Sequence, residues 1–139
     1  MKELVSERIQ RISREYQGKI AVSQGSWTIT YQELLKEIER EARNMEKAGL
    51  RSGRRVVTVL PNSFQALRFF LASFFTGVVP LPLSPRYPRE LVQKIFQQAD
   101  AQLLLTDPSF GEIPGIPQGV MAENGEIAYP GRLTPPQAT

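Results

Sequence analysis

The side chains that most often carry catalysis are missing from this sequence. Its 139 residues include neither His nor Cys. This excludes a His-based catalytic triad, a thiolate nucleophile and a Cys-ligated zinc or iron–sulfur site. Two carboxylates, Glu37 and Glu41, have the spacing of one helix face, but Lys, Arg and Glu alternate around them in the pattern of a solvated helix. We therefore expect this pair to be solvated and not catalytic.

Arg86 is the cation best placed to bind a ligand. In an open α/β sheet, ligands gather beyond the C-terminal ends of the strands, and the predicted ends lie at residues 61–63, 84–86 and 106–107. Arg86 is the cation among them, and a guanidinium group suits phosphate oxygens. The alternative is a surface Arg that pairs with Glu90, for roughly a few tenths of a kcal/mol. Asp107 follows an apolar strand, where we expect it to form a turn.

The overall charge and hydropathy exclude two classes of partner. The chain has 17 Lys+Arg against 14 Asp+Glu, a net charge of +3, but neither a basic run nor interleaved aromatic residues indicate a nucleic-acid partner. The uncharged, mostly apolar run at residues 69–83 is shorter than the roughly 20 residues of a membrane span, and Gly and Pro interrupt it. The N-terminus lacks the apolar core of a signal peptide. We expect a cytoplasmic protein.

The elements that would position Arg86 alternate along the chain. A hairpin with a turn at 24–25 precedes a helix that Thr30 and Glu33 begin as a capping box. Helices and strands then alternate to residue 106, which predicts an α/β fold with a mostly parallel sheet. The last of these helices should turn Leu91, Val92, Ile95 and Phe96 inward. Helices are expected at residues 3–16, 31–48, 64–76 and 88–99, and strands at 19–23, 26–30, 55–60, 78–83, 102–106, 116–121 and 126–129.

Two stretches depart from ordinary amphipathic patterning. Residues 64–76 carry apolar side chains all round the helix axis, which predicts burial on several sides. Residues 108–139 hold 6 of the 11 prolines and 5 of the 10 glycines. We therefore divide the chain into an α/β subdomain, residues 1–107, and a Pro/Gly-rich tail or start of a next segment, residues 108–139.

Ordered short motifs resemble the AMP-binding, or adenylate-forming, enzymes. Ile29 to Leu34 (ITYQEL) is similar to the T-Y-x-E-L signature of this family, which includes acyl-CoA synthetases, luciferases and adenylation domains of peptide synthetases. Residues 56–63 (VVTVLPNS) resemble the strand and turn that follow it. The stretches at 70–83 and 91–107 resemble the later "GAVPVPL" and "LLTD" segments. The resemblance covers roughly residues 5–107 and implies the N-terminal subdomain of the adenylate-forming synthetase fold.

The resemblance implies a chemistry for the complete enzyme. Family members attack the α-phosphate of ATP with a carboxylic-acid substrate, forming an acyl-adenylate and pyrophosphate, and many transfer the acyl group to coenzyme A. ATP, Mg²⁺ and coenzyme A would be the cofactors. In some CoA ligases of the family an Arg after the Pro of this loop contacts a coenzyme A phosphate, and Arg86 in Ser84-Pro85-Arg86 matches that position.

The departures from the family pattern limit what this chain does alone. It lacks the phosphate loop that ends in Pro-Lys-Gly, the later aromatic-Thr-Glu segment, the ribose-binding Asp and the C-terminal catalytic Lys. We therefore expect an inactive, N-terminal scaffold fragment of an AMP-dependent synthetase that binds no cofactor tightly and has no catalytic or metal-ligating residue of its own.

Two alternatives to this fragment stay open. One is a non-enzymatic module or split subunit that binds a partner through the helix at residues 64–75. The other is an unrelated α/β ligand-binding domain. In the fragment itself, either the missing portion or self-association would cover that helix.

Overall fold

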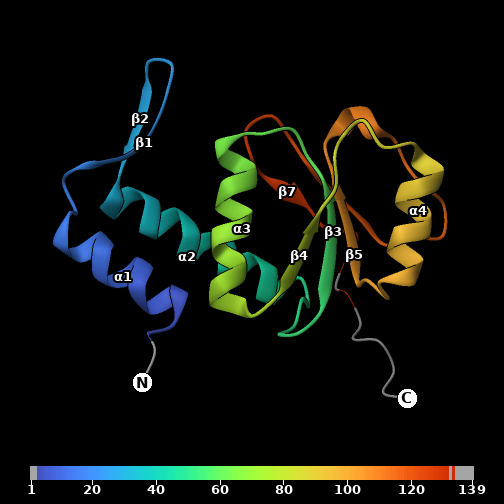
Figure 1. Ribbon diagram of the computed structural model, residues 1–139, viewed down its shortest axis with the longest axis horizontal. Helices are drawn as coiled ribbons and strands as arrows, with labels where there is room; N and C mark the ends of the chain where they lie inside the picture. Colours follow the sequence, from blue (N-terminus) through green and yellow to red (C-terminus); the bar gives the residue numbers. More distant parts are fainter. Residues whose placement is uncertain (1–2, 132, 134–139) are drawn as a thin grey trace.

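The structure, a computed structural model, describes residues 3–131 and 133 and has the α/β architecture that the sequence predicts. Its helices alternate with strands along most of the chain (Figure 1). In chain order the elements are α1 (Val5–Glu15), β1 (Ile20–Gln24), β2 (Trp27–Thr30), α2 (Tyr31–Lys47), β3 (Arg55–Val59), α3 (Phe64–Thr76), β4 (Val79–Pro82), α4 (Arg89–Gln98), β5 (Leu103–Thr106), the 3₁₀ turn η1 (Pro108–Phe110), β6 (Gln118–Met121) and β7 (Ile127–Ala128).

Five strands form the main sheet, in the order β4-β3-β5-β6-β7. The pairs β3/β4, β3/β5 and β5/β6 are parallel, and β7 returns antiparallel to β6. The strands β3 and β5 at the centre are almost wholly buried, as expected of strands covered on both faces. This confirms a mostly parallel sheet. The division of the chain after Asp107 stays a prediction, and β6 and β7 lie in the same sheet as the strands before it.

Helices cover the two faces of the sheet unequally. The helices α1, α2 and α3 lie on one side and α4 on the other (Figure 1). The larger core joins α2 and α3 to the sheet around Ile38, Met45 and Phe69, all fully buried. The smaller core lies under α4 around Val92 and Leu104. Among the described residues, no helix is long and apolar enough to cross a membrane.

The start of α2 follows the predicted capping box. The hydroxyl of Thr30 accepts from the backbone N–H of Glu33 at 3.2 Å, and the Glu33 carboxylate accepts from the backbone N–H of Thr30 at 3.0 Å. These bonds satisfy two donors that a helix start leaves free. The preceding hairpin is also confirmed, but its turn is Gly25-Ser26, one residue later than predicted. Gly25 has a φ of +62°, which suits the first position of a tight hairpin turn.

The strand β4 occupies an edge of the sheet, and its prolines explain why. The backbone N–H of Val79 donates to the carbonyl of Arg54, directly before β3, and that of Leu83 donates to the carbonyl of Thr58 in β3. Residues alternate in direction along a strand, so Pro80 and Pro82 turn their backbone toward the open edge, where the N–H that they lack is not needed. The predicted short strand at residues 78–83 is therefore confirmed as Val79–Pro82.

One burial prediction is wrong. Leu91, expected to face inward, is 39% exposed, because α4 turns Val92 and Phe96 toward the sheet. The all-round apolar helix α3 is buried over part of its circumference only, and Phe74 is 53% exposed, as expected of a fragment in which something else covers that side. The sheet and α2 bury Phe69 and Ala72 on the inner side of α3 and leave the outer side uncovered.

Candidate functional site

A hollow lies beyond the carboxyl ends of β3 and β5, at the edge of the sheet where the sequence predicts a ligand site. The loop after β3 leads to α3 on one face, whereas the chain after β5 passes to the face of α4, where Phe110 and Ile113 pack. Diverging loops of this kind open a crevice at the end of a parallel sheet. Here the crevice has a volume of about 390 Å³ and is lined by Ser63, Asp107 and Ser109 among other residues.

Asp107 separates this crevice from a second hollow of about 490 Å³. The hydroxyl of Ser109 donates to the Asp107 carboxylate at 2.8 Å, directly before the turn η1. The prediction that Asp107 forms a turn is therefore confirmed. In the second hollow, the side-chain amide of Gln118 donates to the Thr106 hydroxyl at 3.1 Å and to the Gly111 carbonyl at 2.8 Å. These bonds fix the wall of the hollow.

Arg86 lies apart from both hollows. It is exposed in the loop after β4, on the opposite side of β3 from β5. Its backbone N–H donates to the Ser84 hydroxyl at 3.2 Å, and neither hollow is lined by its side chain. Among the ion pairs of the described residues, none joins Arg86 to Glu90. The three predicted strand ends therefore meet at one edge of the sheet, but Arg86 is not gathered with Ser63 and Asp107.

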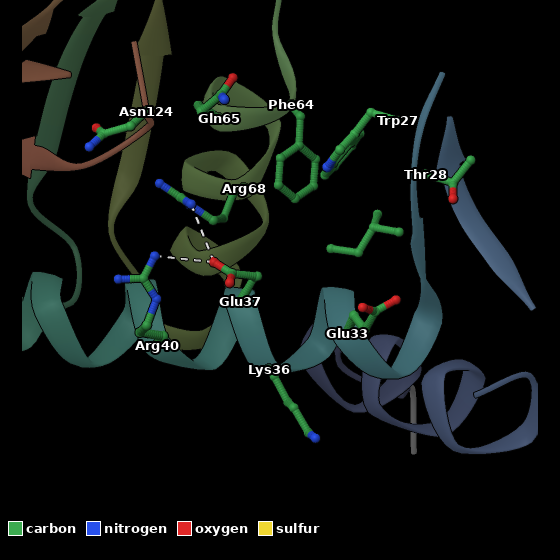
Figure 2. A pocket seen from close by; sticks show the side chains of 11 residues that line it. Trp27, Thr28, Glu33, Lys36, Glu37, Arg40, Phe64, Gln65, Arg68 and Asn124 are labelled. Atoms are coloured by element: carbon green, nitrogen blue, oxygen red, sulfur yellow. Dashed lines mark hydrogen bonds and ion pairs between the residues drawn. The ribbon is translucent and has the colours of Figure 1, made fainter. Parts of the chain in front are cut away.

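A third pocket, of about 510 Å³, lies between β2, α2 and α3 (Figure 2). The rings of Trp27 and Phe64 lie against each other on one side of it, with centroids 4.7 Å apart. The opposite side is charged, and the guanidinium groups of Arg40 and Arg68 both point toward Glu37 (Figure 2). The pocket thus joins an aromatic wall to an ion-pair network.

Arg68 is the centre of this network. It lies on α3 and is 4% exposed. Its Nη1 lies 3.3 Å from the Glu37 carboxylate and its Nη2 lies 3.4 Å from the Glu41 carboxylate. The same Nη2 donates to the carbonyl of Gly125 in the β6–β7 turn, while the Nε atom has no hydrogen-bond partner within the described residues. A buried cation needs such partners, so the network binds α2, α3 and the β6–β7 turn together.

The burial of Glu41 changes its acidity. Burial raises the pKa of the Glu41 carboxyl, and the nearby positive charge of Arg68 opposes that rise. The ion pair with Arg68 alone would lower the pKa of Glu41. Glu41 is only 4% exposed, however, and the cost of removing its charge from water is the larger effect. The Tyr129 hydroxyl lies in the same surroundings, and burial together with the Glu41 charge raises its pKa.

The expectation that Glu37 and Glu41 are both solvated is therefore wrong for Glu41. A signal for its burial is present in the sequence. Leu34, Ile38, Glu41 and Met45 follow spacings of four, three and four, which place Glu41 within the apolar stripe of α2. Arg68, the one charged residue among the 13 of α3, is its counterpart. Two opposite charges in two apolar stripes indicate a buried pair.

Potential metal ligands do not gather in the described part of the chain. Within residues 3–131 and 133, no three Asp or Glu side chains lie close enough together to hold a metal ion.

Comparison with known proteins decides the family. The sequence pattern of the AMP-binding enzymes matches residues 9–129. The chain belongs to the AMP-binding enzyme family. This confirms the resemblance in the motifs at residues 29–34 and beyond, and with it the adenylate-forming class.

The relatives are much longer proteins. The chain is 32% identical over 105 residues to chalcone synthase cfoA of Aspergillus candidus, covering 76% of this chain and 4% of that protein. It is 31% identical over 104 residues to tyrocidine synthase 3 of Brevibacillus parabrevis, covering 75% of this chain and 2% of that protein. The chain therefore spans only a small fraction of the curated relatives it matches.

Two solved structures of one bacterial protein share the fold. The N-terminal subdomain of NpsA from Klebsiella oxytoca superposes with a TM-score of 0.76 at 23% identity, covering 88% of this chain and 32% of that one. An artificially fused adenylation–PCP di-domain, NpsA-ThdA, superposes with a TM-score of 0.77 at 23% identity, covering 88% of this chain and 23% of that one. At this identity the likeness shows the fold alone, which is that of a part of an adenylation N-terminal subdomain.

Proposed function

We propose that this chain is the N-terminal scaffold of an adenylation domain that activates a carboxylic acid with ATP. The observation that carries the proposal is the family match over residues 9–129 together with the fold of an adenylation N-terminal subdomain. In the complete domain, a carboxylate oxygen attacks the α-phosphorus of ATP and pyrophosphate leaves, which yields an acyl-adenylate. The part played by this chain is to hold the sheet and its strand-end loops in place.

The acyl acceptor that the comparisons favour is a carrier protein. Tyrocidine synthase 3 is a relative, and the solved NpsA-ThdA protein is a fusion of an adenylation domain to a PCP. These relatives give transfer to coenzyme A no specific support. A contact between Arg86 and a coenzyme A phosphate therefore stays a prediction, supported by its exposure at the end of β4.

Inactivity of the chain alone is part of the proposal. The sequence contains no Pro-Lys-Gly phosphate loop, and phosphoryl transfer depends on groups that position and neutralise the phosphates. The crevice between the β3 and β5 loops offers Asp107 and Glu123, which are acidic, and no Lys or Arg. Such a lining suits neither the phosphates of ATP nor pyrophosphate.

A chimera tests the proposal. The part of NpsA that superposes on this chain would be replaced by residues 3–133, and acid-dependent ATP–pyrophosphate exchange would be measured over a panel of amino and aryl acids. We expect exchange by the chimera and none by the 139-residue chain. A chimera whose circular dichroism shows a folded protein, but which gives no exchange with any acid, would contradict the scaffold role.

A further inference from the structure

The pocket between β2, α2 and α3 has an aromatic half and a cationic half (Figure 2). Trp27 and Phe64 form the aromatic half. Trp27 stays 42% exposed although its ring lies against Phe64, so part of the indole is free to contact another group. The guanidinium groups of Arg40 and Arg68 lie on the other side, together with the side-chain amide of Asn124 (Figure 2). Such a division suits a ligand with a ring at one end and a negative charge at the other.

Arg68 has donors to spare on the cationic side. A guanidinium group carries five N–H bonds and accepts none. Within the described residues, its acceptors are the Glu37 and Glu41 carboxylates and the Gly125 carbonyl, and Nε has no partner. Arg68 is 4% exposed and lines the pocket. A buried donor without an acceptor costs free energy, so this part of the pocket favours a further oxygen.

Glu37 supplies an anion to this site, but with a single oxygen. Its Oε2 atom accepts from Arg40 Nη2 at 3.2 Å and from Arg68 Nη1 at 3.3 Å. Charge-assisted hydrogen bonds of this type are shorter when well formed, about 2.7–2.9 Å. The Glu37 side chain is 35% exposed and can turn into solvent. An external carboxylate in its place can give one oxygen to each guanidinium.

Neighbouring acidic groups limit the charge of the ligand. Arg40 Nη2 lies 3.1 Å from the Glu126 carboxylate, and Arg68 Nη2 lies 3.4 Å from the Glu41 carboxylate. Phosphate, which carries nearly two negative charges at neutral pH, would be repelled by these carboxylates more strongly than a group with one charge. The charges therefore favour a carboxylate over a phosphate.

We propose that this pocket binds a small aromatic carboxylate, whose ring contacts Trp27 and whose carboxylate replaces that of Glu37 between Arg40 and Arg68. The pocket volume, about 510 Å³, is in the range of small-molecule sites. Arg40 and Arg68 line neither of the hollows at the strand ends. The inference is thus independent of the proposed function, and its test requires no ATP.

Trp27 is the only tryptophan of the chain, so a single indole N–H resonance in the NMR spectrum reports on the pocket. The 139-residue chain would be titrated with benzoate, with benzamide, which lacks the charge, and with acetate, which lacks the ring. Benzylamine and phenyl phosphate would test a cation and a more highly charged anion. We expect benzoate to shift the resonance saturably, and benzamide and acetate to bind at least about tenfold more weakly.

Three results of this titration would overturn the proposal. One is the absence of a saturable shift at up to about 10 mM benzoate. Another is an affinity for benzamide or acetate equal to that for benzoate, which would make either the charge or the ring irrelevant. The third is tighter binding of benzylamine or phenyl phosphate than of benzoate, which would assign the pocket to a different class of ligand.

Arg40→Met tests the contact with the carboxylate and should weaken benzoate binding by at least about tenfold. Lys36→Met is the matched control, because Lys36 points away from the two guanidinium groups (Figure 2), and it should change the affinity by less than about twofold. Circular dichroism would show that both variants are folded. Equal losses in the two variants would indicate general attraction to positive charge and would contradict the proposed site.

Glu37→Gln tests the replacement of Glu37 by the ligand. Removal of the competing charge should strengthen benzoate binding by at least about threefold. Glu46→Gln, which removes an exposed carboxylate of α2 outside the pocket, is the control for the change in net charge and should leave the affinity unchanged. Benzoate binding by Glu37→Gln that is no tighter than that of Glu46→Gln would overturn the proposal.

Discussion

The guanidinium of Arg68 on α3 lies 3.4 Å from the carboxylate of Glu41 on α2, and both side chains are buried in the apolar seam between the two helices. The pair also reaches the β6–β7 turn through the carbonyl of Gly125. A buried ion pair adds little net stability relative to apolar side chains, but the loss of one partner leaves an uncompensated charge. The seam is therefore sensitive to single changes.

Arg68→Met should destabilise the chain by about 3–5 kcal/mol, because Glu41 is left buried without its partner. Urea denaturation would measure the change. Arg40→Met is the matched control, since Arg40 also pairs with Glu37 but its side chain is 40% exposed, and it should cost about 1 kcal/mol or less. The double variant Arg68→Met with Glu41→Leu should recover most of the loss. A double variant as unstable as Arg68→Met alone would contradict the buried pair.

The raised pKa of Glu41 predicts a pH dependence of stability. The folded chain holds the Glu41 proton more strongly than the unfolded chain, whose Glu pKa is about 4.3. The free energy of unfolding should therefore fall as the pH rises through the window between those two pKa values. The groups around Glu41 that act on it are Arg68, Arg40 and Glu126. Glu41→Gln removes the carboxyl group whose ionisation causes this fall. The free energy of unfolding of the variant, relative to wild type, should therefore increase from about pH 4 upward and then level off.

Glu33 provides the opposite control. Hydrogen bonds from Thr30 hold the pKa of the Glu33 carboxyl below its ordinary value. The ionised Glu33 therefore stabilises the folded chain at a pH above the pKa of Glu in the unfolded chain, and this stabilisation is lost as the pH falls. Glu33→Gln should therefore be less stable than wild type at pH 7, and the difference should shrink at acid pH. A Glu41→Gln difference that shows the same sign of pH dependence as Glu33→Gln would reject the burial argument.

Gly125→Ala should destabilise the β6–β7 turn. Gly125 has a φ of +87°, and a Cβ there would lie 2.5 Å from Gln65 Cγ and 2.9 Å from Arg68 Nη2. Gly115→Ala is the matched control, since its φ is +83° but no atom lies within 4 Å of the added Cβ. Both variants introduce similar backbone strain, about 1 kcal/mol, so any excess loss at Gly125 measures the close approach to Arg68. Equal losses by thermal or urea denaturation would show that the turn does not need this contact.

Arg86→Ala separates the two acyl acceptors. If Arg86 contacts a coenzyme A phosphate, the variant in an active chimera should weaken coenzyme A binding by about tenfold, as expected for one charge-assisted hydrogen bond. Isothermal titration with coenzyme A would measure the change in affinity. Arg89→Ala is not a suitable control, because Arg89 donates a structural hydrogen bond to the Glu112 carbonyl. Lys94→Ala, an exposed cation on α4, is the control. Equal affinities of wild type and Arg86→Ala for coenzyme A would contradict a contact between Arg86 and a coenzyme A phosphate.

Local patterning predicted most of the fold because its rules act within a few residues. The capping box at Thr30 and Glu33 and the proline-limited strand β4 follow from such rules. The burial of Glu41 is indicated only when the apolar stripe of α2 is compared with that of α3, where Arg68 is its counterpart. The side of α3 that exposes Phe74 depends on which elements pack against the helix, and its all-round apolar pattern does not specify that side. The position of Arg86 across β3 from Asp107 depends on strand order, which residue spacing does not specify.

The most direct test of the scaffold role is a search for an acyl-adenylate made by the purified 139-residue chain. The chain would be incubated with ATP, Mg²⁺ and a panel of carboxylic acids, and the products analysed by mass spectrometry beside the NpsA chimera. We predict no AMP ester from the chain and an acid-dependent AMP ester from the chimera. Formation of an AMP ester by the 139-residue chain alone would contradict the account.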